Sequence, residues 1–123
     1  MSESAAKKIL IVEDDEFLRS LTAKRLEKES YTVVIAADGE QALTALGTEK
    51  PDLVLLDLLL PGVNGFEVLE KMDKKMPVVV FSNLGQKEDI EKAKGLGADD
   101  FLIKANFTLD DVVAKVNDYL KKS

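Results

Sequence analysis

The sequence predicts an α/β fold in three α/β/α layers, built on a doubly wound, five-stranded parallel sheet with strand order 2-1-3-4-5. Five short apolar runs, rich in β-branched residues, have the character of strands buried on both faces. A helical segment separates each run from the next, as right-handed parallel crossovers require. Five such units at this chain length favour the 2-1-3-4-5 order. The predicted strands are residues 8–12, 32–36, 53–57, 78–82 and 101–104.

The segments between these runs carry helix signals. The last one has apolar residues at the i, i+3, i+4, i+7 spacing of an amphipathic helix, and other helices are expected over about 64–72 and 86–94. Three helices begin with residue pairs that resemble capping boxes. The pairs are Asp38 with Gln41, Asn64 with Glu67, and Thr108 with Asp111.

Length and composition narrow the range of possible functions. The 123 residues favour one domain, residues 7–123, preceded by a flexible tail at 1–6. The absence of Cys and His excludes disulfides, thiol or imidazole catalysis and a phosphohistidine. A net charge of −6 argues against direct nucleic-acid binding. No apolar run approaches the roughly 20 residues of a membrane span, and no secretory signal is visible, so we expect a cytoplasmic protein.

Polar side chains end four of the five predicted strands. They are Glu13 and Asp14 after the first, Asp57 at the third, Ser82 at the fourth and Lys104 at the fifth. The carboxyl ends of parallel strands meet at one edge, so these groups should lie together. Two carboxylates about 4 Å apart repel by roughly 1 kcal/mol in water and about 4 kcal/mol near a protein surface. Oxygen ligands without nitrogen or sulfur select Mg²⁺, Mn²⁺ or Ca²⁺, and a small open site favours Mg²⁺, with Mn²⁺ as an alternative.

Each of these residues has a simpler structural explanation when taken alone. Asp14 and Asp15 could cap the first helix, Asp57 could end a strand, Ser82 could form a turn, and Lys104 could be an ordinary surface lysine. Asp57 is the hardest to explain in this way, because it interrupts an apolar run and a lone buried carboxylate is costly. The set of groups on one edge favours a phosphate-handling site.

The sequence resembles the receiver domain of two-component response regulators, in its stand-alone, CheY-like form with the flavodoxin-like fold. The resemblance spans residues 8–120. It rests on the order and spacing of several motifs, which are residues 9–15, 53–57 and 61–65, Ser82, and residues 97–104.

The resemblance implies that Asp57 accepts a phosphoryl group from a histidine kinase, a phosphotransfer protein or a small acyl phosphate. It further implies that Asp14 and Asp57 bind Mg²⁺ directly, with Glu13 acting through a water and the backbone carbonyl of Leu59 as a further ligand. Lys104 would bind a phosphoryl oxygen. The chain would then be a signalling switch rather than an enzyme, catalysing only its own phosphorylation and slow dephosphorylation.

The resemblance also implies an output surface. Ser82 would move toward the phosphoryl group and Phe101 would fill the space released, which changes the face formed by the fourth helix, fifth strand and fifth helix. An unidentified downstream protein would bind there, and the chain would be a monomer or a weak dimer through this face.

Four positions depart from the family pattern. Ala105 replaces the usual Pro after Lys104, and a trans peptide is expected because a cis bond before a non-proline residue costs about 2.5–4 kcal/mol. Phe101 replaces a frequent Tyr and lacks its hydroxyl. Leu59 and Leu84 offer no polar group to orient a water, which predicts slow dephosphorylation.

Three other functions fit the sequence less well. A receiver-like interaction module that is never phosphorylated would have the same fold but no need of the whole polar set. A Mg²⁺-dependent phosphatase would need a second acid two residues after Asp57, where Leu59 stands. For a nucleotide binder, the glycines of Gly95-Leu96-Gly97 follow a helix rather than a strand, which is the wrong context.

Overall fold

The computed structural model describes residues 6–120 of the chain. The expected tail at residues 1–6 therefore lies, apart from residue 6, outside the described residues, as do 121–123. The strands are β1 (Lys8–Val12), β2 (Thr32–Ala36), β3 (Leu53–Leu56), β4 (Val78–Ser82) and β5 (Asp100–Ile103). The helices are α1 (Glu16–Lys28), α2 (Gly39–Glu49), α3 (Gly65–Lys71), α4 (Lys87–Gly95), the 3-10 turn η1 (Lys104–Asn106) and α5 (Leu109–Leu120).

The five strands form one parallel sheet in the order β2-β1-β3-β4-β5. This confirms the predicted fold. The register aligns Val12 of β1 with Leu56 of β3, and Ser82 of β4 with Ile103 of β5. The carboxyl ends of four strands thus meet along one edge of the sheet.

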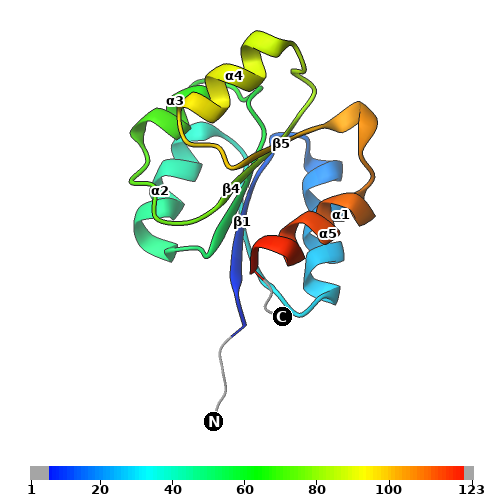
Figure 1. Cartoon of the computed structure of the whole chain (residues 1–123). Coiled ribbons are helices and arrows are strands. Elements are labelled where there is room, and N and C mark those ends of the chain that lie inside the picture. Colours follow the sequence, from blue (N-terminus) through cyan, green and yellow to red (C-terminus); the bar gives the residue numbers. More distant parts are fainter. Residues whose placement is uncertain (1–5, 121–123) are drawn as a thin grey trace.

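Alternating side chains of the sheet build two cores. Figure 1 shows α1 and α5 on one face and α2, α3 and α4 on the other. Ile9 and Ile11 of β1 face the α1/α5 side, where they pack with Leu26 of α1, whereas Leu10 and Val12 face the other layer. Burial on both faces explains why these strands are continuous apolar runs rather than alternating ones.

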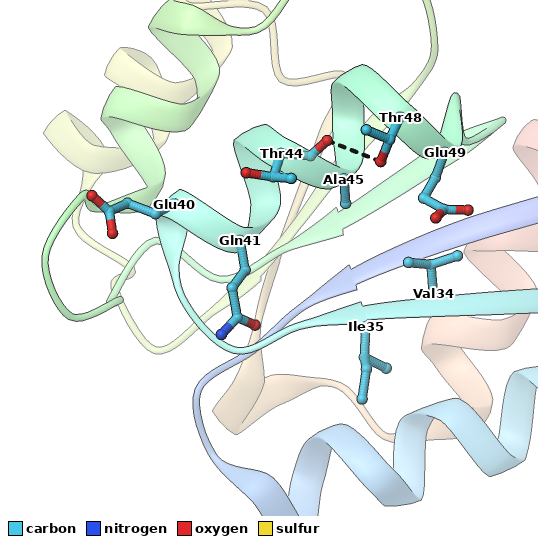
Figure 2. A pocket seen from close by; sticks show the side chains of 8 residues that line it. All are labelled: Val34, Ile35, Glu40, Gln41, Thr44, Ala45, Thr48 and Glu49. Carbon is cyan, nitrogen blue, oxygen red and sulfur yellow. Dashed lines mark hydrogen bonds between the residues drawn. The ribbon is translucent and has the colours of Figure 1, made fainter.

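The β2 strand is an edge of the sheet, and Figure 2 shows its alternation directly. Val34 points toward α2, while Ile35 points to the opposite side. A hollow of about 430 Å³ lies beside them against α2. None of the polar residues predicted for the site lines this hollow.

The predicted helix starts are confirmed. Asn64 and Glu67 form a reciprocal capping box, and Thr108 and Asp111 exchange the same pair of bonds, each side chain accepting from the other's backbone N–H. At α2, Asp38 accepts from the Gln41 backbone N–H. The Gln41 side chain, however, accepts from the backbone N–H of Ala37, so this cap reaches one residue further back.

Two predicted strand ends are wrong by a residue. β3 ends at Leu56, because the Asp57 side chain accepts a hydrogen bond from the Leu59 backbone N–H at 3.0 Å and turns the chain. β5 ends at Ile103, which is aligned with Ser82, the last residue of β4. Lys104 has no strand residue beside it to pair with and begins η1.

Two glycines allow close approach around the loop that follows β3. A Cβ atom on Gly65 would lie 2.5 Å from Cα of Leu58 and 2.6 Å from the backbone oxygen of Asp57. A Cβ atom on Gly39, the first residue of α2, would lie 2.0 Å from the backbone oxygen of Val63. Absent side chains at these positions therefore let α2 and α3 pack against the β3–α3 connection.

We expect Gly39→Ala to lower the free energy of unfolding by about 1–3 kcal/mol, because the added methyl group overlaps backbone that cannot move freely. The matched control is Gly47→Ala in the same helix, where a Cβ atom meets nothing within 4 Å. This control should raise the free energy of unfolding by about 0.5–1 kcal/mol, since alanine favours helix over glycine. Urea unfolding followed by circular dichroism measures both, and equal effects would contradict the steric explanation.

Candidate functional site

Three carboxylates gather at the edge where β1 and β3 end. Glu13 follows β1 and Asp57 follows β3, and each is only 4% exposed, while Asp14 is exposed. One oxygen of each of the three lies within 4.8 Å of the other two. The pairing of the two strands continues past their ends, because the Asp57 backbone N–H donates to Val12 at 3.0 Å. Sheet register therefore forces the acidic groups together.

Lys104 bridges the two buried acids and offsets part of their charge. Its ammonium lies 2.7 Å from Oε1 of Glu13 and 2.8 Å from Oδ2 of Asp57. The side chain must cross β4 to reach them, since β4 lies between β3 and β5. Its Nζ passes 5.9 Å from the ring centroid of Phe81 on β4. One lysine from the fifth strand's end thus bridges acids from the first and third.

Burial and neighbouring charge shift the pKa values in this cluster. Burial raises the pKa of Glu13 above its ordinary value and the Asp57 charge adds to this, while bonds from Lys104 and the Asp15 backbone N–H oppose it. Burial alone would lower the pKa of Lys104. The hydrogen bonds to Asp57 and Glu13 and their charges outweigh that effect and raise it. The lysine is therefore held as a cation.

Ser82 and Phe101 lie on the strands predicted for them. Ser82 ends β4 between the acids and β5, is fully buried, and accepts a long hydrogen bond of 3.4 Å from the Leu84 backbone N–H. Phe101 is half-buried in β5 and packs against the core on the α2/α3/α4 side. Leu59 has an exposed side chain, which leaves its backbone carbonyl as the only polar acceptor that it offers near Asp57.

Arg19 of α1, which no sequence pattern indicated, also contacts the site. Its guanidinium donates to the backbone carbonyl of Glu13 at 3.0 Å and to that of Asp14 at 3.4 Å. These contacts position the loop that carries both acids, and they add a positive charge beside them. No local motif marks Arg19. Only its position on the first turn of α1, whose N-cap Asp15 follows the acidic pair, could have suggested it.

The donor set fits a hard divalent cation. The three groups offer carboxylate oxygens only, which are the ligands that Mg²⁺ prefers, and the exposed Asp14 leaves one side of the cluster open to solvent. Mutual repulsion of three charges at this spacing supplies the driving force for a cation.

Comparison with known proteins identifies the family. The model of the response regulator receiver domain matches residues 9–117. The chain belongs to the response regulator receiver family. The alkaline phosphatase synthesis transcriptional regulatory protein PhoP of Bacillus subtilis (strain 168) is 39% identical over 120 residues, which are 95% of this chain and 50% of that protein. The chain spans about half the length of such curated relatives.

Solved receiver domains have the same fold. The BeF3-activated N-terminal receiver domain of Klebsiella pneumoniae RstA is 30% identical, with a TM-score of 0.87 over 94% of this chain and 100% of that one. The Vibrio cholerae chemotaxis protein CheY4 is 26% identical, with a TM-score of 0.86 over the same shares of the two chains. The resemblance to response regulator receiver domains is thereby confirmed.

Replacing Lys104 by Met should destabilise this receiver domain, because two buried carboxylates lose their shared cation. We expect a decrease of about 2–4 kcal/mol in the free energy of unfolding. The matched control is Lys115→Met, whose more exposed ion pair with Asp100 should contribute less than about 1 kcal/mol.

Adding Glu13→Gln to the Lys104→Met variant should recover part of the loss, since only one buried charge then lacks a partner. Urea unfolding of the four proteins measures these differences. An equal loss for the two single lysine variants would contradict the stabilising role of the bridge.

Proposed function

We propose that this receiver domain is a phosphoryl switch that accepts a phosphoryl group on Asp57. The observation that carries the proposal is the environment of this carboxylate. Asp57 is buried, yet it lies at the rim of the sheet, beside two further acids and in contact with a lysine. A structural role alone would not explain such a concentration of opposite charges around one residue.

The chemistry follows from the contacts of Asp57. A carboxylate oxygen forms a bond to phosphorus, and the bond from phosphorus to a histidine nitrogen, or to an acyl oxygen, breaks with its electron pair leaving on the donor. Catalysis of such a transfer depends mainly on positioning and on stabilising charge spread over the phosphoryl oxygens. The Lys104 ammonium and the Leu59 backbone N–H already bond to Asp57 oxygens, so both donors are beside the group that would carry the phosphoryl, which supports a role in stabilising its charge.

Mg²⁺ is the cofactor that we propose for this reaction, with Mn²⁺ as an alternative. Asp14 and Asp57 would hold it directly, Glu13 through a water, and Leu59 through its backbone carbonyl. A bound Mg²⁺ would neutralise charge on the phosphoryl oxygens and the acids. The carboxylate cluster and the hard-oxygen character of its donors support this assignment.

Output would pass through Ser82 and Phe101 to the surface formed by α4, β5 and α5. We propose that the Ser82 hydroxyl donates to a phosphoryl oxygen after transfer and that the Phe101 ring then packs into the space released. Asp100, the neighbour of Phe101, is bonded to Lys115 and Tyr119 of α5. A movement at Phe101 would therefore strain contacts with α5, which gives a local charge a route to a docking surface.

The partners follow from the switch. The phosphoryl donor would be a histidine kinase or a phosphotransfer protein, and an unidentified downstream protein would bind the α4, β5 and α5 surface. The Bacillus relative is named a transcriptional regulatory protein, so transcription is one candidate outcome for the pathway. Among residues 6–120, no helix has both the length and the apolar character needed to cross a bilayer.

Incubation with acetyl phosphate and Mg²⁺ should add the mass of one phosphoryl group to the intact protein, and Asp57→Asn should abolish the addition. Chelation of Mg²⁺ should prevent it, because the transferred charge would then face the acids unshielded. Intact-protein mass spectrometry measures the product. Asp73→Asn, which removes an exposed acid remote from the cluster, is the matched control and should behave as wild type.

The same experiment separates the alternatives. If the chain were a receiver-like interaction module, neither the wild type nor Asp57→Asn would gain mass. A phosphatase would release free phosphate over many turnovers without accumulating the modified form. Phosphorylation that persists in Asp57→Asn would show that the acceptor has been misassigned.

Dephosphorylation should be slow in the wild type and faster when Leu59 is replaced by Asn and Leu84 by Glu. The exposed Leu59 and half-buried Leu84 offer no polar group to orient an attacking water, whereas the replacements do. Decay of the phosphorylated protein after removal of acetyl phosphate measures the lifetime, and we expect roughly a tenfold or greater increase in rate, within the range of an oriented water. A Leu60→Met variant controls for packing changes in the same loop, and an unchanged rate in the double variant would contradict shielding.

A further inference from the structure

A groove lies between α2, the end of α3 and the connection from α3 to β4. It consists of two adjoining hollows, of about 350 and about 220 Å³. The two hollows share four lining residues, so they form one continuous feature, here termed the α2–α3 groove. The shared residues are Leu46, Gly47, Asp73 and Met76.

The α2–α3 groove is separate from the phosphorylation site. Pro51, which lines it, lies just before β3, whereas Asp57 lies just after the same strand. The two features are thus at opposite ends of the sheet. A function of the groove is therefore not part of the phosphoryl chemistry proposed above.

The apolar lining of the groove is adaptable. Leu43 and Leu46 of α2 are half-buried there, and Met72 and Met76 complete the surface. The chain has three methionines, and the only two within residues 6–120 both line this groove. Unbranched, polarizable methionine side chains adapt to varied partners and are abundant at peptide-binding surfaces.

The polar lining is basic, although the chain as a whole carries a charge of −6. Three lysines, Lys50, Lys71 and Lys75, line the groove together with one acid, Asp73. Asp73 pairs with Lys75 at 3.3 Å. No other described residue forms an ion pair with Lys50 or Lys71, and both are exposed. Two ammonium groups therefore remain available beside an apolar surface.

The part of α2 that lines the groove has residues that are unfavourable for helix stability. Gly47 lies inside the helix, where glycine is unfavourable, and its missing side chain leaves open space in the groove. Lys50 caps the same helix in the left-handed conformation, with φ of 48°, a position that usually takes glycine. The helix would be more stable with a larger residue at position 47 and glycine at position 50. The observed residues instead keep the groove open and place a cation at the end of the groove.

We propose that the α2–α3 groove binds an acidic amphipathic helix of a partner protein. Two hollows in succession accept two apolar side chains from one helix face, as helix-in-groove recognition requires. Carboxylates beside those anchors would pair with Lys50 and Lys71. Charge complementarity selects an acidic partner over a basic one, and the apolar lining selects a helix with an exposed apolar stripe over a simple polyanion.

The test uses a fluorescein-labelled synthetic peptide with leucines on one helical face and glutamates elsewhere. A second peptide replaces every glutamate by lysine. Fluorescence anisotropy with the full chain should show the acidic peptide binding roughly tenfold or more tightly than the basic one, a difference readily resolved by titration. Affinity for the acidic peptide should fall as salt is added, because salt screens its attraction to the lysines. If the net negative charge of the chain dominated, salt would instead screen a repulsion and the affinity would rise.

Gly47→Leu should weaken binding of the acidic peptide roughly tenfold or more, because the new side chain fills the groove. Leucine favours helix more than glycine, so loss of folding would not explain the effect, and circular dichroism verifies this. The matched control is Ser20→Leu, because Ser20 is also exposed on a helix but lies on α1, outside both the groove and the α4, β5 and α5 surface. It should bind as wild type.

A double variant, Lys50→Glu with Lys71→Glu, tests the role of charge and should abolish the preference for the acidic peptide. Lys24→Glu with Lys28→Glu on α1 makes the same change in net charge and should preserve it. In wild type, the methyl resonances of Met72 and Met76 should shift on titration with the acidic peptide, which places the contact directly.

Failure of the acidic peptide to bind, equal binding of both peptides, or wild-type binding by Gly47→Leu would each overturn the proposal. Phosphorylation by acetyl phosphate should be unchanged in the groove variants, because the groove and Asp57 lie at opposite ends of β3. Failure of the groove proposal and failure of the phosphoryl switch are thus distinguished by separate measurements.

Discussion

The contact on which the site depends is the bridge from Lys104 to Glu13 and Asp57. Two buried carboxylates this close to a third would repel one another, and removal of both from water adds a further cost. A single ammonium between them offsets both penalties. The same arrangement leaves Asp14 exposed and the cluster open on one side, so that the site is stable without being sealed.

The parallel sheet makes that contact geometrically necessary. The parallel order and register of β1, β3 and β4 bring their carboxyl ends to one edge. Glycines at the starts of α2 and α3 then allow both helices to pack closely against the β3–α3 connection, which begins at Asp57. The receiver fold thus concentrates charge at one end of the sheet, while the other end carries an apolar groove bordered by lysines.

Prediction from sequence succeeded where the deciding interactions are local. Helix starts such as Asn64 with Glu67 depend on residues three apart, and buried strands depend on short apolar runs. The strand ends at Leu56 and Ile103 were each misplaced by one residue, because they depend on the Asp57–Leu59 turn and on where β4 stops. Arg19 was missed because its partners are backbone carbonyls of a loop, which no sequence pattern identifies.

The sequence by itself determined the order of strands and helices, the fold class and the set of polar groups at the strand ends, because capping, periodicity and burial act over a few residues. Only the tertiary structure decided that the Lys104 side chain passes Phe81 to reach two acids at once, and that Gly47 and Lys50 face Met76 across a groove. These contacts join segments far apart in the chain. Their distances depend on how strands and helices pack, which no local pattern encodes.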